Sequence, residues 1–167
     1  MWTKVEKQLK NHPERLRVAR VLVQNGLSVR NGGIFCNDIE IPHARVARVA
    51  HVDRRTVNLT VRAIEGNTEL NAIFKYLRSA GHSLKEVARY LGLGVVEITP
   101  VDARMPGILA KAASLIAQKG ISIRQAIVDD PELAPEPNLT LVVENKLPGE
   151  LVPKFLEIEG VSKVSIY

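Results

Sequence analysis

The sequence predicts an α+β protein, in which a helical N-terminal part with a small β-ribbon precedes a strand-rich C-terminal part. Two observations predict this class. Apolar residues recur at helical spacing over most of residues 1–93, with one short extended stretch at residues 27–41. Over residues 94–167, stretches that alternate with a period of two residues are separated by two stretches of helical period. We therefore expect two small domains, residues 1–93 and residues 94–167.

The composition is that of an ordinary globular protein. Of the 167 residues, 46% are apolar and 25% are charged, so we do not expect a disordered chain. No apolar run approaches the roughly 20 residues that cross a membrane, and Met1–Lys10 is too charged for a leader. The single Cys36 excludes an intrachain disulfide and a multi-cysteine zinc site. These observations predict a soluble, cytoplasmic protein that has no membrane partner.

Charge is distributed unevenly between the two parts. Residues 1–93 hold 16 Lys and Arg against 8 Asp and Glu, a net charge of +8. Residues 94–167 hold 7 against 10, a net charge of −3, and together the parts account for the net charge of +5. A basic part joined to a mildly acidic part is typical of a nucleic-acid reader that carries a separate sensing module.

The N-terminal part begins with two amphipathic helices. Thr3–Asn11 is apolar along one side, and Pro13 opens a second helix that ends at Asn25–Gly26. Residues 27–41 then form short extended pieces, which we interpret as a small β-hairpin or ribbon. The turn signals between these pieces are Asn31–Gly32–Gly33 and Asn37–Asp38.

Two short helices joined by a tight turn follow. The helices are Pro42–Ala50 and Arg54–Glu65, and the turn is His51–Asp53. Asp53 stands at the N-cap of the second helix, where its carboxylate can accept from free backbone N–H groups. The apolar residues that this arrangement places on the inner faces are Val46, Ala47, Ala50, Val52, Val57 and Val61.

Basic and amide side chains line the outward face of the second helix, at Arg54, Arg55, Asn58 and Arg62. This is the layout of a helix-turn-helix, and VARVAHVDRRTV resembles the pattern I/V-A-x-x-L-G-V-S-x-x-T-V of DNA-binding repressors. His51 replaces the usual glycine where the turn tends to need a positive φ, which histidine tolerates better than most residues. The alternative interpretation is an amphipathic helix pair with a solvated arginine face.

In a DNA-binding helix-turn-helix, six side chains would contact the duplex. Arginine pairs naturally with guanine and asparagine with adenine, so the expected base readers are Arg54, Arg55 and Asn58. Phosphate contacts set the position of a protein on the duplex, and the expected ones are Arg48, Thr56 and Arg62. The ribbon at residues 27–41 would either lie beside the DNA as a wing or cover the helical core.

Two further short helices close the N-terminal part. Thr68 caps the first of them, which ends at Gly81–Ser83. Ser83 and Glu86 form a capping box for the second. The residues that we expect to point inward from this second helix are Leu84, Val87, Tyr90 and Leu91. The glycines of residues 92–94 mark the domain boundary.

The C-terminal part follows the order strand, helix, strand, strand, helix, strand. This β-α-β-β-α-β order over about 75 residues is that of the ferredoxin-like fold, and only one longer loop, Asp129–Pro137, interrupts it. That loop is either an exposed connector or a segment that closes over a cationic group. The expected elements are the strand 95–99, the helix Pro106–Lys119, the strands 121–128 and 139–145, the helix Pro148–Ile158 and the strand 161–167.

The turn after the first of these strands, PVDARMPGIL at Pro100–Leu109, predicts an anion site. Gly107 leaves backbone N–H groups open at the start of a helix, where the helix dipole also favours negative charge. Such a nest suits the carboxylate of a free amino acid. The alternative, on spacing alone, is that Pro106 and Gly107 simply begin a helix.

The segment VDARMPGILA, followed by a helix and KGISI, resembles an ACT domain. The resemblance implies a ferredoxin-like fold, pairing of chains through the domain into a homodimer or higher homo-oligomer, and a small-molecule effector, usually an amino acid. Ser122 stands where many of these domains have an asparagine that anchors the ligand. The other contact candidates that the resemblance implies are Asp102, Arg104, Met105, Pro106, Gly107, Ile108 and Leu109.

From MWTKVE through VDRRTV to KVSIY, the whole chain resembles a group of archaeal predicted regulators of amino-acid metabolism. The resemblance implies an amino-acid-responsive transcriptional regulator, in which the ligand acts allosterically on DNA binding. One alternative is a regulatory subunit that senses an amino acid and docks on a biosynthetic enzyme, and another is a structural dimer module without a ligand. We expect no enzyme activity, no cofactor and no metal, because the histidines have no ligand spacing and no nucleophile–base motif or phosphate loop appears.

Overall fold

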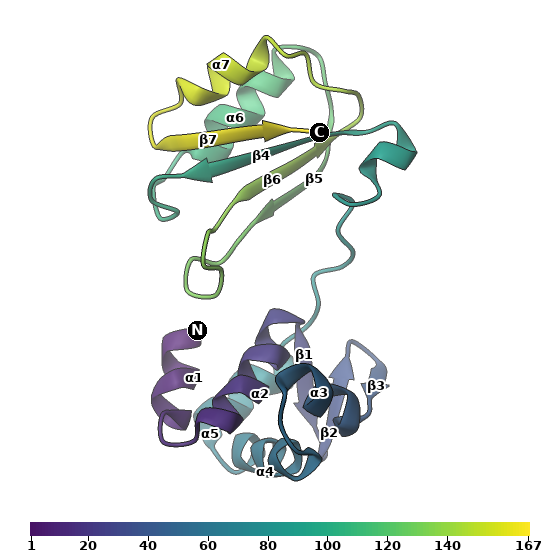
Figure 1. The fold of residues 1–167 in the computed structure, drawn as a ribbon, viewed down its shortest axis with the longest axis vertical. Helices are drawn as coiled ribbons and strands as arrows, with labels where there is room; N and C mark the ends of the chain where they lie inside the picture. The colour runs from purple at the N-terminus through teal and green to yellow at the C-terminus, as the bar shows by residue number, and fades with distance from the viewer. The chain divides into compact units, whose positions relative to one another are not determined.

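A computed structural model describes all residues from Met1 to Tyr167 and divides the chain into two compact units, Met1–Gly81 and His82–Tyr167 (Figure 1). The division lies twelve residues before the boundary that we predicted at residues 93 and 94, because residues 82–93 pack on the sheet of the second unit. The mixed α+β class agrees with the prediction. No helix has the length and apolar character that a membrane span requires.

Five helices build most of the first unit, and α2 lies among α1, α3 and α4 (Figure 1). Their apolar faces meet in one core, in which Val18, Leu22 and Ile64 are fully buried. Pro13 stands at the first position of α2, where its missing N–H costs nothing. The helices are α1 Trp2–Leu9, α2 Pro13–Gln24, α3 His43–Ala50, α4 Arg54–Glu65 and α5 Thr68–Tyr76.

The predicted ribbon is a three-stranded antiparallel sheet of β1 Leu27–Arg30, β2 Gly33–Cys36 and β3 Ile39–Ile41. Asn31 and Gly32 both have positive φ, 51° and 76°, as a two-residue hairpin turn of this kind requires. The side chains of Leu27, Val29 and Ile34 are buried, so β1 and the start of β2 cover the helical core. The β2–β3 turn and the start of β3 are exposed and acidic, with Asp38 in the turn and Glu40 in the strand. This charge makes the turn a poor phosphate-binding wing.

The end of the first unit differs from the sequence prediction. Asn67, and not Thr68, caps α5, because the Asn67 Oδ1 atom accepts from the Leu70 N–H at 3.0 Å. The helix ends at Tyr76, well before the predicted Gly81. The predicted helix over residues 83–91 is only a short 3₁₀ turn, η1 at Ala88–Leu91.

The second unit has the predicted strand and helix order. Its four strands form one antiparallel sheet in the order β5-β6-β4-β7, and both central strands are therefore paired on each side. The elements are β4 Gly94–Pro100, α6 Ile108–Ala117, β5 Ile123–Val128, β6 Leu139–Val143, α7 Leu151–Leu156 and β7 Val161–Ile166.

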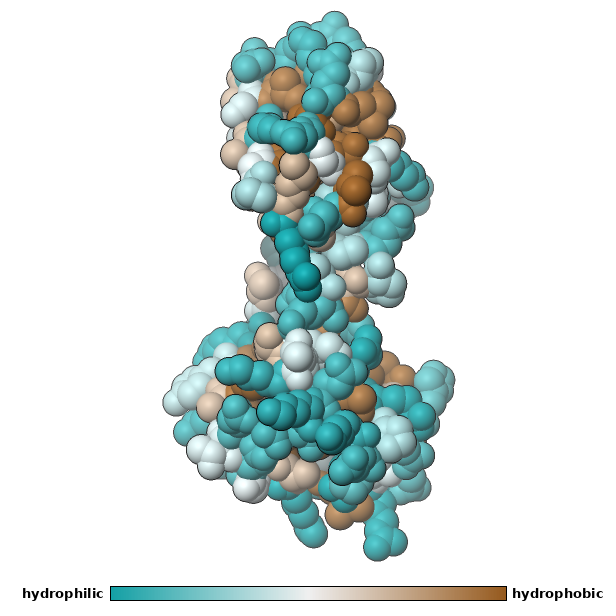
Figure 2. All heavy atoms as spheres, turned by 90° about the vertical axis from the view of Figure 1, so that its left-hand side faces the viewer, coloured by the Kyte–Doolittle hydropathy of each residue, from teal (hydrophilic) through white to brown (hydrophobic).

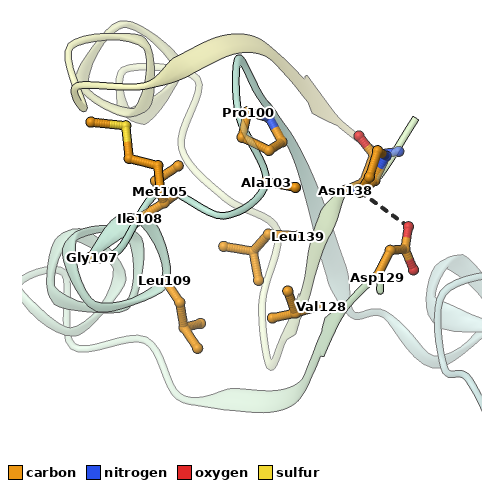
Figure 3. Close-up of a pocket in the computed structure, with 11 residues that line it drawn as sticks. Pro100, Ala103, Met105, Gly107, Ile108, Leu109, Val128, Asp129, Asn138 and Leu139 are labelled. Atoms are coloured by element: carbon orange, nitrogen blue, oxygen red, sulfur yellow. Dashed lines mark hydrogen bonds between the residues drawn. The ribbon is translucent and has the colours of Figure 1, made fainter. Parts of the chain in front are cut away.

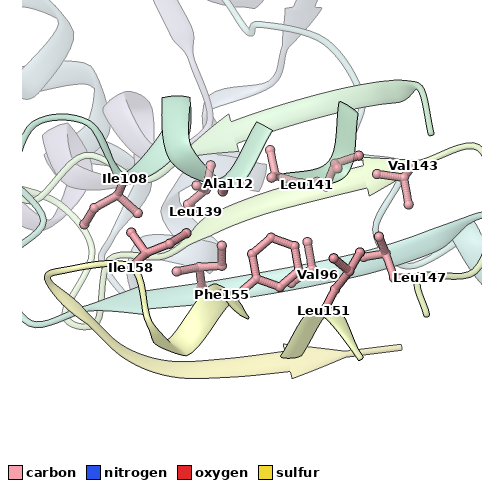
Figure 4. Packing of buried hydrophobic residues seen from close by; sticks show 12 residues of the cluster. Val96, Ile108, Ala112, Leu139, Leu141, Val143, Leu147, Leu151, Phe155 and Ile158 are labelled. Atoms are coloured by element: carbon pink, nitrogen blue, oxygen red, sulfur yellow. The ribbon is translucent and has the colours of Figure 1, made fainter. Parts of the chain in front are cut away.

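One face of this sheet is covered by α6 and α7, as Figure 4 shows from close by. Ala112 of α6 and Phe155 of α7 are fully buried, and they pack in one cluster with Val96 and Leu141 from the two central strands. Successive side chains of a strand point to opposite faces. The residues between these core positions therefore face the other side of the sheet.

Residues 82–93, which we name the strap, lie on that other face. Ala88 is buried against Val95 and Val142. The Gln125 amide of β5 fixes the strap backbone, since its Nε2 donates to the His82 carbonyl at 2.7 Å and its Oε1 accepts from the Leu84 N–H at 2.8 Å. Four side chains of residues 83–91 were predicted to point inward, and only Leu84 does so, by packing on the buried cluster. The prediction was wrong for the other three, which are exposed: Val87, Tyr90 and Leu91.

An ion pair adds to the strap. Lys85 Nζ lies 2.7 Å from Glu97 Oε1 of β4, and this hydrogen bond raises the pKa of Lys85 above 10.5. A raised pKa means that the stabilising contribution is fully present below the ordinary lysine pKa and is lost as the pH rises through the folded value. The contribution is small because the Lys85 side chain is 36% exposed and therefore screened by solvent.

Lys85→Met is expected to lower the free energy of unfolding of the second unit by about 0.5 kcal/mol at neutral pH. The difference from wild type should vanish as the pH rises past the raised Lys85 pKa, above 10.5. Urea unfolding followed by circular dichroism at several pH values measures it. Lys146→Met, at an exposed lysine outside the strap, is the control, and an equal loss at every pH would contradict the assignment.

Candidate functional site

The turn between α3 and α4 has the predicted geometry. His51, which follows α3, adopts the left-handed conformation with φ 52° and ψ 51°. Asp53 is extended and caps α4, because its Oδ1 accepts from the Arg55 N–H at 2.6 Å. The backbone thus reverses within three residues, from Ala50 to Arg54.

Buried side chains fix the rotation of both helices about their axes. Val46, Ala47 and Ala50 of α3 face inward, and Val57 and Val61 of α4 are fully buried against them. These are the predicted inner faces, with Val52 in the turn half-buried. The spacing of four residues between the buried valines places the opposite side of α4 in solvent.

Five arginines of α3 and α4 are exposed, and none of their guanidinium groups has a hydrogen bond or an ion pair within the chain. No acidic residue occurs in α3, and the only acid of α4, Glu65, accepts from the Gly32 N–H at 2.7 Å. The five charges therefore have no partner in this unit. They are the predicted Arg48, Arg54, Arg55 and Arg62, and also Arg45.

Arg45 was missed by the sequence analysis. It lies three residues before Arg48 on α3, so the two lie on neighbouring positions of one helical face. That spacing was the signal, and it could have placed Arg45 among the candidates.

The two uncharged candidates on α4 have partners within the chain. The Thr56 hydroxyl donates to Glu14 Oε2 of α2 at 3.3 Å, so Thr56 lies towards an acid and not on the arginine face. Asn58 is half-buried, and its Oδ1 lies 2.5 Å from Nδ1 of His43. The sequence analysis did not find the contact between His43 and Asn58, because the two residues are separated by fifteen positions and come together only when the helices pack.

A cavity of about 230 Å³ opens at the end of β4 and the start of α6 in the second unit (Figure 3). Four of the predicted ligand residues line it, so the turn after β4 and the start of α6 form part of the cavity wall. Five of the seven other wall residues are apolar, and five of the seven come from β5, β6 and the loop between them. The lining residues are Pro100, Ala103, Met105, Gly107, Ile108, Leu109, Val128, Asp129, Pro137, Asn138 and Leu139.

Polar groups enter this cavity from two sides. The Asn138 N–H donates to Asp129 Oδ2 at 3.1 Å, as Figure 3 shows, and no contact engages Asp129 Oδ1. At the other side, Gly107 has φ 92° and begins α6 without any side-chain cap. The first backbone N–H groups of α6, from Ile108 on, are therefore unpaired. Asp129 thus lies at the edge of the cavity, with its carboxylate directed towards Asn138, and the uncapped start of α6 lies on the other side (Figure 3).

Four predicted ligand residues do not line the cavity. Asp102 accepts from the Arg104 N–H at 2.9 Å and so stabilises its own turn, while Arg104 and Pro106 are exposed. Ser122 directly precedes β5, whereas the wall residue Val128 is the last residue of that strand. The two residues are about 20 Å apart along an extended chain. The wall residue Met105 also packs against Gly160. A Cβ at Gly160 would come within 2.1 Å of the Met105 sulfur, so only glycine fits there.

The sequence analysis missed one side of the cavity. Val128, Asn138 and Leu139 flank the loop that it treated as either a connector or a closing segment. Asp129 was noted there for its charge, but its place at the edge of the cavity depends on the strand order, which residue spacing alone does not give. No group of three or more His, Cys, Asp or Glu side chains is placed to hold a metal ion.

Hydrophobic surface gathers on the second unit in the view of Figure 2, whereas the face of the first unit in that view is mainly hydrophilic. Exposed apolar side chains of the second unit include Leu109 and Val128, which lie in the cavity wall. Such partly exposed walls are typical of a site that a ligand or a second surface covers.

No protein-family model and no curated protein matches the chain. Similar solved structures include a mutant of Rv3291c, with 18% identity and a TM-score of 0.27, covering 92% of this chain and 89% of that one. The crystal structure of PH0061 has 11% identity and a TM-score of 0.25, covering 92% and 88%. MtbAldR (Rv2779c) has 16% identity and a TM-score of 0.27, covering 90% of each chain. Scores this low carry no argument about fold or function.

His51→Gly is expected to raise the free energy of unfolding of the first unit by about 1 kcal/mol, because glycine adopts a positive φ without a Cβ penalty. His51→Val should lower it by at least as much. The fluorescence of Trp2, the single tryptophan, reports unfolding of this unit in urea.

His12→Gly is the matched control, since His12 has a negative φ of −132° and glycine therefore relieves no left-handed strain there. A His51→Gly variant that is no more stable than wild type would show that the turn is not held in the left-handed conformation.

Proposed function

We propose that the chain is a DNA-binding regulator, in which α3 and α4 form a helix-turn-helix. The observation that carries the proposal is the set of five exposed guanidinium groups without a partner on this helix pair. Unpaired arginines that share one surface are the groups that neutralise DNA phosphates and release counterions. The first unit also holds 14 Lys and Arg against 7 Asp and Glu over residues 1–81, a net charge of +7.

Within this proposal the roles of the side chains follow from their positions. Arg54, Arg55 and Asn58 read base edges from the first turns of α4. Arg48, Arg62 and the additional Arg45 contact phosphates. We assign no DNA contact to Thr56, because its hydroxyl is bound to Glu14. In a homodimer, the two recognition helices would require an inverted repeat in the DNA.

We further propose that the second unit is a ferredoxin-like domain of the ACT type that binds a small amino acid as effector. The cavity of about 230 Å³ fits a ligand of that size. The unpaired N–H groups at the start of α6 would receive the carboxylate, the Asp129 carboxylate would receive the ammonium group, and the wall of Ala103, Leu109 and Leu139 would receive an apolar side chain. The ligand regulates DNA binding only if it binds two arrangements of the protein unequally.

A second function is docking on a partner protein through the same helix pair. Two exposed apolar residues favour it, since Val49 is 60% exposed and Leu59 is 38% exposed among the arginines. Arginine and apolar side chains together are typical of protein interfaces. In neither function do we assign a catalytic role or a cofactor to the chain.

The full chain is expected to bind a fluorescent duplex of random sequence at low salt, with a Kd in the micromolar range at physiological salt. Anisotropy titrations between about 50 and 200 mM salt give the slope of log K against log salt. The double variant Arg48→Ala/Arg62→Ala should reduce this slope by about two, because each phosphate contact contributes about one.

Lys10→Ala removes an exposed charge directly after α1 of the same unit and should leave the slope unchanged. The DNA-binding proposal fails if wild type binds no duplex, or if the double variant keeps the wild-type slope. Co-purification of a protein at high salt without nucleic acid would then favour docking.

Binding of apolar amino acids to the full chain is expected in calorimetry. Asp129→Asn should weaken it at least tenfold by removing the charge that pairs with the ammonium group. Ala103→Phe should abolish it by filling the cavity. Asp130→Asn, at a neighbouring exposed acid outside the cavity wall, is the matched control. Equal affinities of Asp129→Asn and Asp130→Asn, or no heat with any amino acid, would refute this assignment.

A further inference from the structure

His43, the first residue of α3, holds the side-chain amide of Asn58 on α4. Nδ1 of His43 lies 2.5 Å from Oδ1 of Asn58 in a partly buried contact. An amide oxygen only accepts hydrogen bonds, so the imidazole must carry a proton on Nδ1 and donate it. The charged imidazole also has a proton there. The contact therefore sets the direction of the Asn58 amide in either protonation state of His43.

Asn58 lies at the centre of the arginine face of α4. Arg54 and Arg55 lie one helical turn before it, and Arg62 lies one turn after it. While His43 holds Oδ1, the two N–H donors on Nδ2 have no partner in the chain. An amide that is not held can rotate by half a turn and present either its oxygen or its nitrogen. The hydrogen bond from His43 prevents this rotation, so the Nδ2 side of the amide remains the donor.

We propose that His43 is a positioning residue, which makes Asn58 a fixed hydrogen-bond donor towards the major groove, and that Asn58 thereby selects a purine through its N7 atom. N7 is an acceptor in both adenine and guanine, whereas the corresponding outer position of a pyrimidine is C5, which is methylated in thymine and offers no acceptor. The thymine acceptor, O4, lies nearer the middle of the groove. The inference rests on the proposed DNA binding through α4. It changes the expected role of Asn58 from the recognition of adenine alone to the recognition of either purine.

Selection from a pool of random duplexes tests the inference on the full chain. Comparison of wild type with Asn58→Ala identifies the base position that depends on Asn58. His43→Phe keeps a ring and removes the donor, and it should lose the purine preference at that position by roughly tenfold. His43→Asn places an amide N–H near the former Nδ1 and should keep most of the preference. Thermal unfolding of each variant checks its fold.

A purine analogue gives a second readout. With 7-deazaguanine or 7-deazaadenine at the identified position, wild-type affinity should fall by roughly tenfold, and that of His43→Phe should change little. The salt dependence of His43→Phe should equal that of wild type, because its arginines are unchanged. If wild type and His43→Phe select the same purine equally strongly, the inference is overturned while DNA binding stands. If wild type binds no duplex, both fail.

Nitrogen NMR of the imidazole tests the contact without DNA. Free histidine favours the Nε2–H tautomer in water, whereas this contact requires Nδ1–H in the neutral ring. At about pH 8, where histidines are ordinarily neutral, His43 should show the Nδ1–H form in wild type and the Nε2–H form in Asn58→Ala. The exposed His12 is the internal reference. An Nε2–H His43 in the wild-type protein overturns the inference.

Discussion

The left-handed turn at His51, followed by the Asp53 cap, is the constraint on which the basic face depends. These residues set where α4 begins and which way it leaves α3. An α-helix turns by about 100° per residue, so a shift of one residue would bring Arg62 towards the position of the buried Val61. Burial of an unpaired guanidinium is costly, whereas the valines gain by burial. The turn and the valines therefore act together to keep the arginines in water.

A different constraint shapes the second unit. Both helices lie on one face of the sheet, and the chain must leave β4 at the sheet end to reach α6. That passage leaves the start of α6 uncapped beside the ends of β5 and β6, and the cavity forms there. The opposite face would expose Val95 and Val142, and the strap covers them with Ala88.

Local signals explain which parts of the fold could be predicted. Pro13, Asp53 and the Asn31–Gly32 turn each act within a few residues, and the helix and strand limits near them were predicted to within one or two positions. The apolar runs in β4 and β6 reflect burial on both faces, because α6 and α7 cover one face and the strap covers Val95 and Val142 on the other. The apolar residues of the strap misled the prediction, because Tyr90 has helical spacing but is 73% exposed.

Features that depend on packing between distant segments could not be predicted. The contact of His43 with Asn58 needs the angle between α3 and α4, and the place of Asp129 in the cavity wall needs the strand order. Packing also removes a candidate. The position of Thr56 on α4 predicted a phosphate contact, but its hydroxyl donates to Glu14 of α2. Residue type and spacing thus predicted candidate residues, and tertiary packing shows which of them are exposed and which have partners within the chain.

The most direct measurement of the central claim is an NMR titration of the arginine side-chain N–H signals of the full chain with duplex DNA at low salt. The account predicts that the signals of Arg54, Arg55 and Arg62 shift, while those of Arg104 and Arg124 in the second unit stay in place. Shifts confined to the second unit, or an unchanged spectrum at saturating DNA, would contradict the assignment of α4 as the DNA-reading helix.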